Sequence, residues 1–264
     1  ILNIEGSLSN ITQTDAFAFD LKNIDVKSTR ENLERFIPND SLSFRVPDTL
    51  ALAGTLRGDL ESFKTKAVLT SPEGVINLDA LATIGSQKRF EGKIAVDSLQ
   101  LGTLLQNTKL GAISLQLEGS GSGTELDNID AQLEGIISQF QYNQYNYQDI
   151  NLAGALENGT GDVSLSIKDE NLNLTSKTSI DFTSESNAIE LTSNIVGADL
   201  RKLGFTKNDI KIAGDVDGSY KGASNSYTIE TSINNGIAVA DNKQYQITPI
   251  KLNARVEDSI TEAT

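Results

Sequence analysis

Aliphatic side chains alternate with polar ones along most of this chain, most regularly between residues 113 and 182. The aliphatic positions in that stretch form successive runs: Ile113, Leu115 and Leu117; Ile129, Ala131 and Leu133; Ile150, Leu152 and Leu156; Val163, Leu165 and Ile167; Leu172 and Leu174. Successive side chains of a β-strand point to opposite faces, so a period of two predicts strands with one apolar and one polar face. We therefore expect a one-sided β-sheet.

Short segments rich in glycine and polar residues separate these runs. They are residues 119–123 (GSGSG), Asn158-Gly159 and residues 168–171 (KDEN). Such segments reverse the chain between paired strands, and runs with the same period continue toward both ends of the chain. The fold class we expect is all-β: a long antiparallel meander that forms one continuous, elongated segment over residues 1–264.

Three segments interrupt the alternation and predict short helical inserts, near residues 29–37, 97–107 and 198–205. In the first, Ser or Thr followed by Glu within one turn is typical of a capped helix start, and Pro38 would stop the helix. In the other two segments, the leucines would lie on one side of a helix of a few turns at most.

The amino-acid composition excludes several classes of chemistry. The 264 residues contain no Cys, His, Met or Trp. Without His and Cys there is no zinc site of the usual kind, no Ser-His-Asp or Cys-His pair and no disulfide. Acidic residues such as Asp127 and Asp130 lack the spacing of a calcium loop. We therefore expect a protein that is not an enzyme and holds no cofactor or metal.

The net charge and the aromatic content restrict the possible binding partners and the possible fold. The net charge is −14, which repels nucleic-acid phosphates and anionic membrane surfaces. Aromatic residues make up 6% of the chain, which favours a thin extended sheet with an aliphatic face. A compact β-sandwich with a lean core is the alternative.

Four segments resemble the TamB/AsmA superfamily, and within it the TamB-like (translocation and assembly module) proteins of the Bacteroidetes type. They are residues 46–74, residues 134–156 (EGIISQFQYNQYNYQDINLAGAL), residues 166–174 (SIKDENLNL) and residues 197–215 (GADLRKLGFTKNDIKIAGD). The resemblance covers most of residues 40–256 and rests on patterns of glycine, aliphatic and Asp/Asn positions. No active-site motif is part of it.

The resemblance implies a U-shaped β-groove, or β-taco, in the periplasm of a diderm bacterium, reaching from the inner to the outer membrane. The implied function is bridge-like transfer of phospholipids, with acyl chains shielded in the groove. The implied partners are phospholipids and an outer-membrane barrel of the BAM/TamA type, met through a part of the chain not present here. An inner-membrane anchor would also lie outside this segment.

Strand parity identifies the side chains expected to line such a groove. They are Ile113, Leu115, Leu117, Leu133, Ile150, Leu152, Leu165, Ile167, Leu172, Leu174, Ile212, Val216 and Ile229. A register shift by one residue would move a whole strand's set to the other face.

Two other functions fit the same alternation. In an assembly or translocation module for outer-membrane proteins, an exposed sheet edge would pair with nascent strands by β-augmentation, and the apolar face would be a core. A surface adhesin built of β-sandwiches would have compact domains and carry no lipid.

Four Asp-Ser/Thr-aliphatic triplets match the acceptor pattern of Bacteroidetes-type periplasmic O-glycosylation. The acceptor hydroxyls are those of Ser41, Thr49, Ser98 and Ser259. These four hydroxyls are candidate acceptors.

Overall fold

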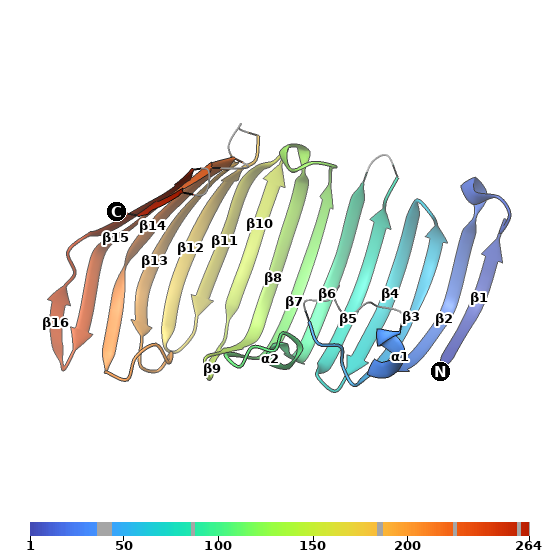
Figure 1. Cartoon of the computed structure of the whole chain (residues 1–264), viewed down its shortest axis with the longest axis horizontal. Helices are drawn as coiled ribbons and strands as arrows, with labels where there is room; N and C mark the ends of the chain where they lie inside the picture. The colour runs from blue at the N-terminus through green and yellow to red at the C-terminus, as the bar shows by residue number, and fades with distance from the viewer. Residues whose placement is uncertain (36–43, 86–87, 184–186, 224–225, 258–259, 264) are drawn as a thin grey trace. The chain divides into compact units, whose positions relative to one another are not determined.

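A computed structural model describes residues 1–35, 44–85, 88–183, 187–223, 226–257 and 260–263. The fold is all-β: antiparallel strands form an open sheet, and helix is scarce (Figure 1). The chain divides into two compact units, residues 1–122 with 135–146, and residues 123–134 with 147–264. We describe them as unit 1 and unit 2. One continuous segment over residues 1–264 therefore remains a prediction.

Unit 1 is a meander in which each strand pairs with the next. Its strands are β1 (Leu2–Ser9), β2 (Ala18–Thr29), β3 (Thr49–Asp59), β4 (Ser62–Ser71), β5 (Gly74–Thr83), β6 (Arg89–Gln100) and β7 (Leu110–Ser122). A 3-10 turn, η1 (Thr14–Ala16), lies between β1 and β2.

Unit 2 repeats this arrangement. Its strands are β10 (Ile150–Glu157), β11 (Thr160–Lys168), β12 (Leu172–Asp181), β13 (Asn187–Asp199), β14 (Ile210–Ala223), β15 (Ser226–Ala240), β16 (Lys243–Gln246), β17 (Ile250–Glu257) and β18 (Ile260–Ala263). Strand β15 pairs with both β16 and β17. The chain passes between the units along β8 (Asp130–Tyr142), which follows η3 (Leu126–Asn128) and precedes β9 (Tyr145–Tyr147).

Two-residue turns with positive φ connect several hairpins. Asn158 (φ 48°) and Gly159 (φ 75°) join β10 to β11, where the sequence predicts a turn. Asp241 and Asn242 do the same between β15 and β16. Two successive left-handed residues match the right twist of the flanking strands, so this turn sets the pairing of Glu157 with Thr160.

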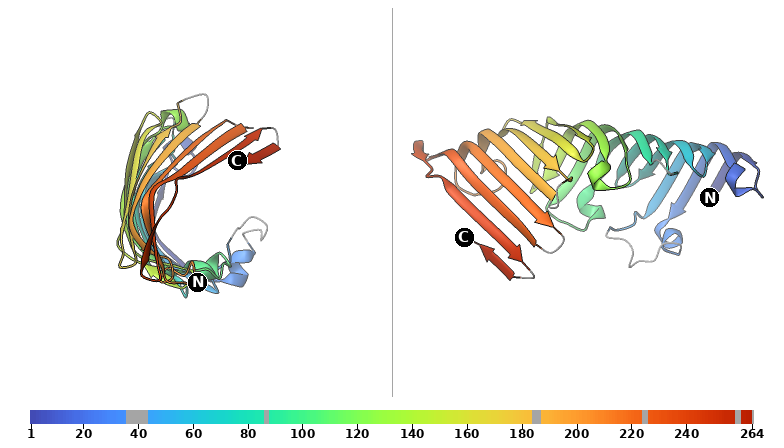
Figure 2. Two further views of the ribbon diagram at one scale, coloured as in Figure 1. Left: turned by 90° about the vertical axis from the view of Figure 1, so that its left-hand side faces the viewer. Right: turned by 90° about the horizontal axis from the view of Figure 1, so that it is seen from above.

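The strand pairing of unit 2 is irregular at neighbouring positions of adjacent strands, and this bends the strands. The register shifts after Asn173 in β12, between Ile195 and Ala198 in β13, and between Ala213 and Asp215 in β14. An extra residue in one strand kinks it and increases its twist. The end-on view shows β12–β15 curving along their length (Figure 2, left).

Two of the three predicted inserts contain a short helix. They are α1 (Arg30–Glu34) within residues 29–37 and α2 (Leu101–Leu104) within residues 97–107. Among the described residues, no helix combines the length and apolarity needed to cross a bilayer.

The helix predicted at residues 198–205 is instead a strand end followed by a single turn. Ala198 and Asp199 still belong to β13, and the Leu203 N–H donates to the Asp199 carbonyl. Gly204 (φ 80°) then donates to Arg201, and the Phe205 N–H donates to Leu200. This is a Schellman motif, which ends the helical path after one turn because the left-handed glycine reverses the chain.

Well-buried side chains gather at strand ends, beside these inserts. In unit 2 they include Ile150, Ile167, Ala198 and Leu203, of which Leu203 is only 2% exposed. In unit 1 they include Val96, just before the register shift of β6, and Ala112 near the start of β7. In the part of the chain that the structure describes, the middle of each sheet has no such core, so most of its apolar side chains stay partly open to solvent.

Candidate functional site: the apolar faces of the two units

Side chains that pair across unit 1 form lateral rows on one face, which we call the unit 1 apolar face. One row runs Leu2, Val26, Leu52, Leu69, Ile76, Val96 and Leu115, and the next runs Ile4, Ile24, Gly54, Ala67, Leu78, Ile94 and Leu117. One further row carries Phe19, Phe63 and Phe90 near the opposite strand ends. No charged residue occupies these positions in β1–β7.

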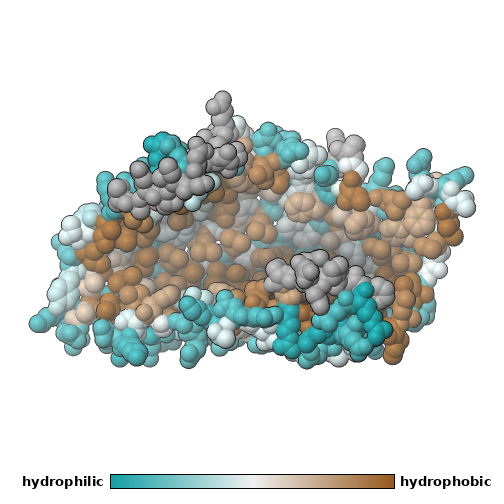
Figure 3. All heavy atoms as spheres, viewed as in Figure 1, coloured by the Kyte–Doolittle hydropathy of each residue, from teal (hydrophilic) through white to brown (hydrophobic). Residues whose placement is uncertain are grey.

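Unit 2 has a face of the same kind, the unit 2 apolar face. Its rows include Ile150, Ile167, Leu174 and Ile195; Leu152, Leu165, Ser176, Ser193, Val216, Ile233 and Ile250; and Leu156, Gly161, Ile180, Ile189, Tyr220, Ile229 and Ala254. Seen as spheres, this face is a hollowed apolar surface with hydrophilic residues along its lower rim (Figure 3). Among the described positions of these rows none is charged.

Side chains on both apolar faces keep much of their surface accessible. In unit 1, Leu78 is 38% exposed and Phe90 is 51% exposed. In unit 2, Ile229 is 38% exposed and Leu252 is 54% exposed. A sandwich core would be covered by a second sheet, and neither unit contains one among its described residues. Each apolar face is thus a surface that water or a ligand must cover.

The opposite face of unit 1 is polar and carries ion pairs between neighbouring strands. Lys66 Nζ lies 2.6 Å from Asp79, and Lys93 Nζ lies 2.7 Å from Glu118. The hydrogen bond from Lys66 holds the pKa of Asp79 below its usual value, and the hydrogen bond to Glu118 raises the pKa of Lys93. These exposed pairs keep this face hydrated and contribute little stability.

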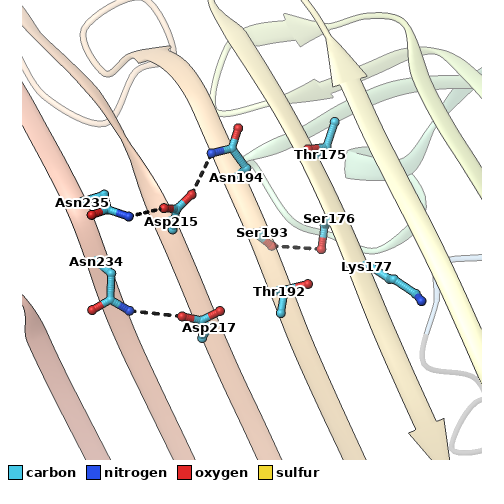
Figure 4. A pocket seen from close by; sticks show the side chains of 10 residues that line it. All are labelled: Thr175, Ser176, Lys177, Thr192, Ser193, Asn194, Asp215, Asp217, Asn234 and Asn235. Atoms are coloured by element: carbon cyan, nitrogen blue, oxygen red, sulfur yellow. Dashed lines mark hydrogen bonds between the residues drawn. The ribbon is translucent and has the colours of Figure 1, made fainter.

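The polar face of unit 2 contains a shallow depression over β12–β15 (Figure 4). Asn194 and Asn235 each donate to Asp215 at 2.7 Å, and Asn234 donates to Asp217 at 3.1 Å. The bonds from Asn235 and Asn194 lower the pKa of Asp215. These amide–carboxylate bonds join adjacent strands, so the depression is a cross-strand polar network.

The residues predicted to line a groove take the following places. In unit 1, Ile113, Leu115 and Leu117 lie on β7, where they pair with Leu99, Val96 and Ile94. In unit 2, Ile150, Leu152, Leu165, Ile167, Leu174, Val216 and Ile229 share the apolar face, with Leu172 and Ile212 continuing the same parity on β12 and β14. Leu133 lies on β8 and is 39% exposed.

The predicted set omits most of the unit 1 apolar face, although its signal is present in the sequence. Leu50, Leu52 and Leu56, and also Ile76 and Leu78, show the same alternation as the residues that were selected. The predicted set also omits the hydroxyl side chains among the aliphatic rows of unit 2. In an alternating sequence, polar residues are assigned to the polar face. The pattern therefore gives no reason to assign a Ser to the apolar face.

Two of the four candidate glycosylation positions can be placed. Thr49 begins β3 and is exposed; its neighbour Asp48 forms an ion pair with Arg30. Ser98 is also exposed and lies in a bulge of β6, where its Oγ donates to Asp97 at 2.8 Å. Ser41 and Ser259 lie outside the described residues.

The described ranges contain no group of three or more acidic side chains placed to hold a metal ion. Comparison of the chain with protein-family models, with curated proteins and with solved structures finds no match.

Proposed function

We propose that the apolar face of each unit binds the acyl chains of phospholipids and shields them from water during transfer between two membranes. One observation carries this proposal: within the described residues, rows of aliphatic side chains cover one face of each sheet without a charged residue, and no second sheet covers that face. Soluble domains rarely leave so much contiguous apolar surface uncovered unless a ligand or partner binds there.

The energetics suit a lipid in transit. Removing one CH₂ group from water is worth about 0.8 kcal/mol, so shielding even part of two acyl chains gives a favourable free energy without polar anchors. Because the contacts are spread over rows of similar side chains, a chain can slide from one strand to the next with little change in energy. The polar face, with its cross-strand ion pairs, stays in water.

The resemblance to the TamB/AsmA superfamily supports a wider setting for this proposal. The protein would act in the periplasm of a diderm bacterium, with phospholipids as cargo and a BAM/TamA-type barrel as outer-membrane partner. The residues proposed to contact acyl chains include Leu152, Leu165 and Val216 in unit 2, and Leu115 and Leu117 in unit 1. All of them lie on an apolar face.

Matched pairs of substitutions in the β10–β11 hairpin test the proposal. Leu152→Asp/Leu165→Asp places two opposed carboxylates on the apolar face, and Ala153→Asp/Ser164→Asp places two opposed carboxylates one residue away on the polar face. Phospholipid that co-purifies with the whole chain is quantified by lipid extraction and native mass spectrometry. We expect the first variant to carry less phospholipid per chain than the parent and the second to carry the same amount.

An assembly module acting by β-augmentation is the alternative, and β1 favours it, because all eight of its residues are exposed. A folded parent that carries no phospholipid would contradict lipid transfer and support this alternative. Equal loss of phospholipid from both double variants would also contradict lipid transfer, since a general effect on folding would then explain the loss.

A further inference from the structure

Four Ser and Thr side chains interrupt the aliphatic rows of the unit 2 apolar face: Ser176 and Thr178 on β12, Ser193 on β13 and Thr231 on β15. The first three lie on adjacent strands. We call them the hydroxyl cluster. Ser176 lies opposite Leu165 on one side and Ser193 on the other, and Ser193 lies opposite Val216. Apolar side chains therefore flank the cluster along the row.

The cluster retains hydrogen-bond donors that the protein does not use. Ser193 Oγ donates to Ser176 Oγ at 2.9 Å, which occupies the hydroxyl hydrogen of Ser193. The hydroxyl hydrogens of Ser176 and Thr178 have no acceptor among the described residues. Both residues are half-buried; Ser176 lies opposite Leu165, and Thr178 lies opposite Val163 and Leu191. A donor without an acceptor beside such apolar side chains is costly once water is displaced.

Hydroxyl side chains on the unit 1 apolar face behave differently. Thr65 Oγ1 donates to the Thr55 carbonyl at 3.1 Å, Ser28 to the Thr29 carbonyl at 3.4 Å, and Ser71 to the Gly74 carbonyl at 3.5 Å. Their donors are satisfied by backbone acceptors. On the unit 1 apolar face, these three hydroxyl residues therefore have acceptors within the protein.

We infer that the hydroxyl cluster receives the ester carbonyls of a diacyl lipid whose chains lie on the neighbouring aliphatic rows. This inference rests on the proposed function. It specifies which chemical group of the lipid unit 2 recognises. An ester carbonyl accepts hydrogen bonds but donates none. Among the described residues of unit 2, no charged side chain lies on this face to bind a phosphate instead. Ligand sites commonly combine an apolar lining with a few polar groups that fix orientation.

A competition between ester and ether lipids tests this inference. The whole chain is incubated with vesicles that contain equal amounts of a diester phosphatidylcholine and its diether analogue, which lacks both carbonyls. Bound lipids are extracted and their ratio is measured. We expect the ratio of bound diester to diether lipid to fall about fivefold to a hundredfold in Ser176→Ala/Thr178→Val/Ser193→Ala, as expected for losing two hydrogen bonds, with total bound lipid little changed.

Two further variants keep the test decisive. Thr175→Val/Thr192→Val removes hydroxyls from the same strands on the polar face and should leave the ratio at the parent's value. Ser176→Ala alone keeps the strand pairing of β12 and β13 intact and should lower the ratio in the same direction. An unchanged ratio in the triple and single variants would overturn the inference while leaving lipid binding intact. A parent that binds neither lipid would overturn the proposed function itself.

Discussion

Leu69 of β4 lies directly opposite Ile76 of β5, and both side chains belong to the unit 1 apolar face. The adjacent pair, Val68 and Asn77, points to the polar face. If each unit binds acyl chains by itself, Leu69→Asp/Ile76→Asp should lower bound phospholipid, whereas Val68→Asp/Asn77→Asp should not. The measurement is phospholipid per chain after extraction. Unchanged lipid in the first variant would restrict binding to unit 2.

Combining the apolar-face substitutions of both units should remove nearly all bound lipid. The fourfold variant Leu69→Asp/Ile76→Asp/Leu152→Asp/Leu165→Asp leaves the polar faces unchanged, so its far-UV circular dichroism should remain that of a β-protein. Lipid retained at the parent's level by a folded fourfold variant would show that the acyl chains bind elsewhere.

The turn after β13 should contribute more stability than the open middle of the sheet. Leu203 is 2% exposed, so Leu203→Ala should lower the free energy of unfolding by about 2–5 kcal/mol. Leu152 is only half-buried, and Leu152→Ala should cost clearly less. Urea unfolding followed by circular dichroism provides both values. Equal losses would mean that the apolar face is covered as a core would be.

Gly204 should resist substitution because its φ is 80° and its N–H closes the Schellman motif. Gly204→Ala forces a side chain into the left-handed region and should cost about 1 kcal/mol or more. Gly197 is the matched control, since an added Cβ there meets no atom within 4 Å. Equal unfolding midpoints for Gly204→Ala and Gly197→Ala would contradict the role given to this turn.

The network around Asp215 should make stability depend on pH in the acidic range. Hydrogen bonds from Asn235 and Asn194 hold the pKa of Asp215 below its ordinary value of 3.8. The carboxylate therefore contributes stability above that value, and the contribution is lost as the pH falls through the lower pKa of the folded state. Between about pH 5 and pH 2, the parent's thermal midpoint should fall more steeply than that of Asp215→Asn. Asn194→Ala/Asn235→Ala should show the same flatter dependence, and a parent-like slope in both variants would refute the assignment.

The sequence predicted the strands and their faces well where the alternation is unbroken, as from Leu115 to Leu117 and from Ile150 to Leu152. It also located the Asn158-Gly159 turn, because both residues tolerate a positive φ. It was wrong about a helix at residues 198–205, since the alternation stops there for a single glycine-terminated turn.

The bulges and the hydroxyl cluster could not be predicted from the same pattern. Between Ile195 and Ala198 the pairing shifts, and Val196 is left 59% exposed although its residue type favours burial. Ser176 and Ser193 have the polar character of outward residues, yet strand register places them among aliphatic rows. Register and bulge positions depend on how neighbouring strands pair. The alternation within one strand carries no information about that pairing.

The most direct test of the account is a site-by-site photocrosslinking scan along β10. A benzophenone amino acid is introduced singly at Leu152, Ala153, Ala155 and Leu156 in the whole chain, in the presence of phospholipid vesicles, and lipid adducts are identified by mass spectrometry. If acyl chains bind the apolar face, adducts form at Leu152 and Leu156, which lie on that face, and none form at Ala153 and Ala155. Equal labelling at all four positions, or a folded protein labelled at none, would contradict that binding.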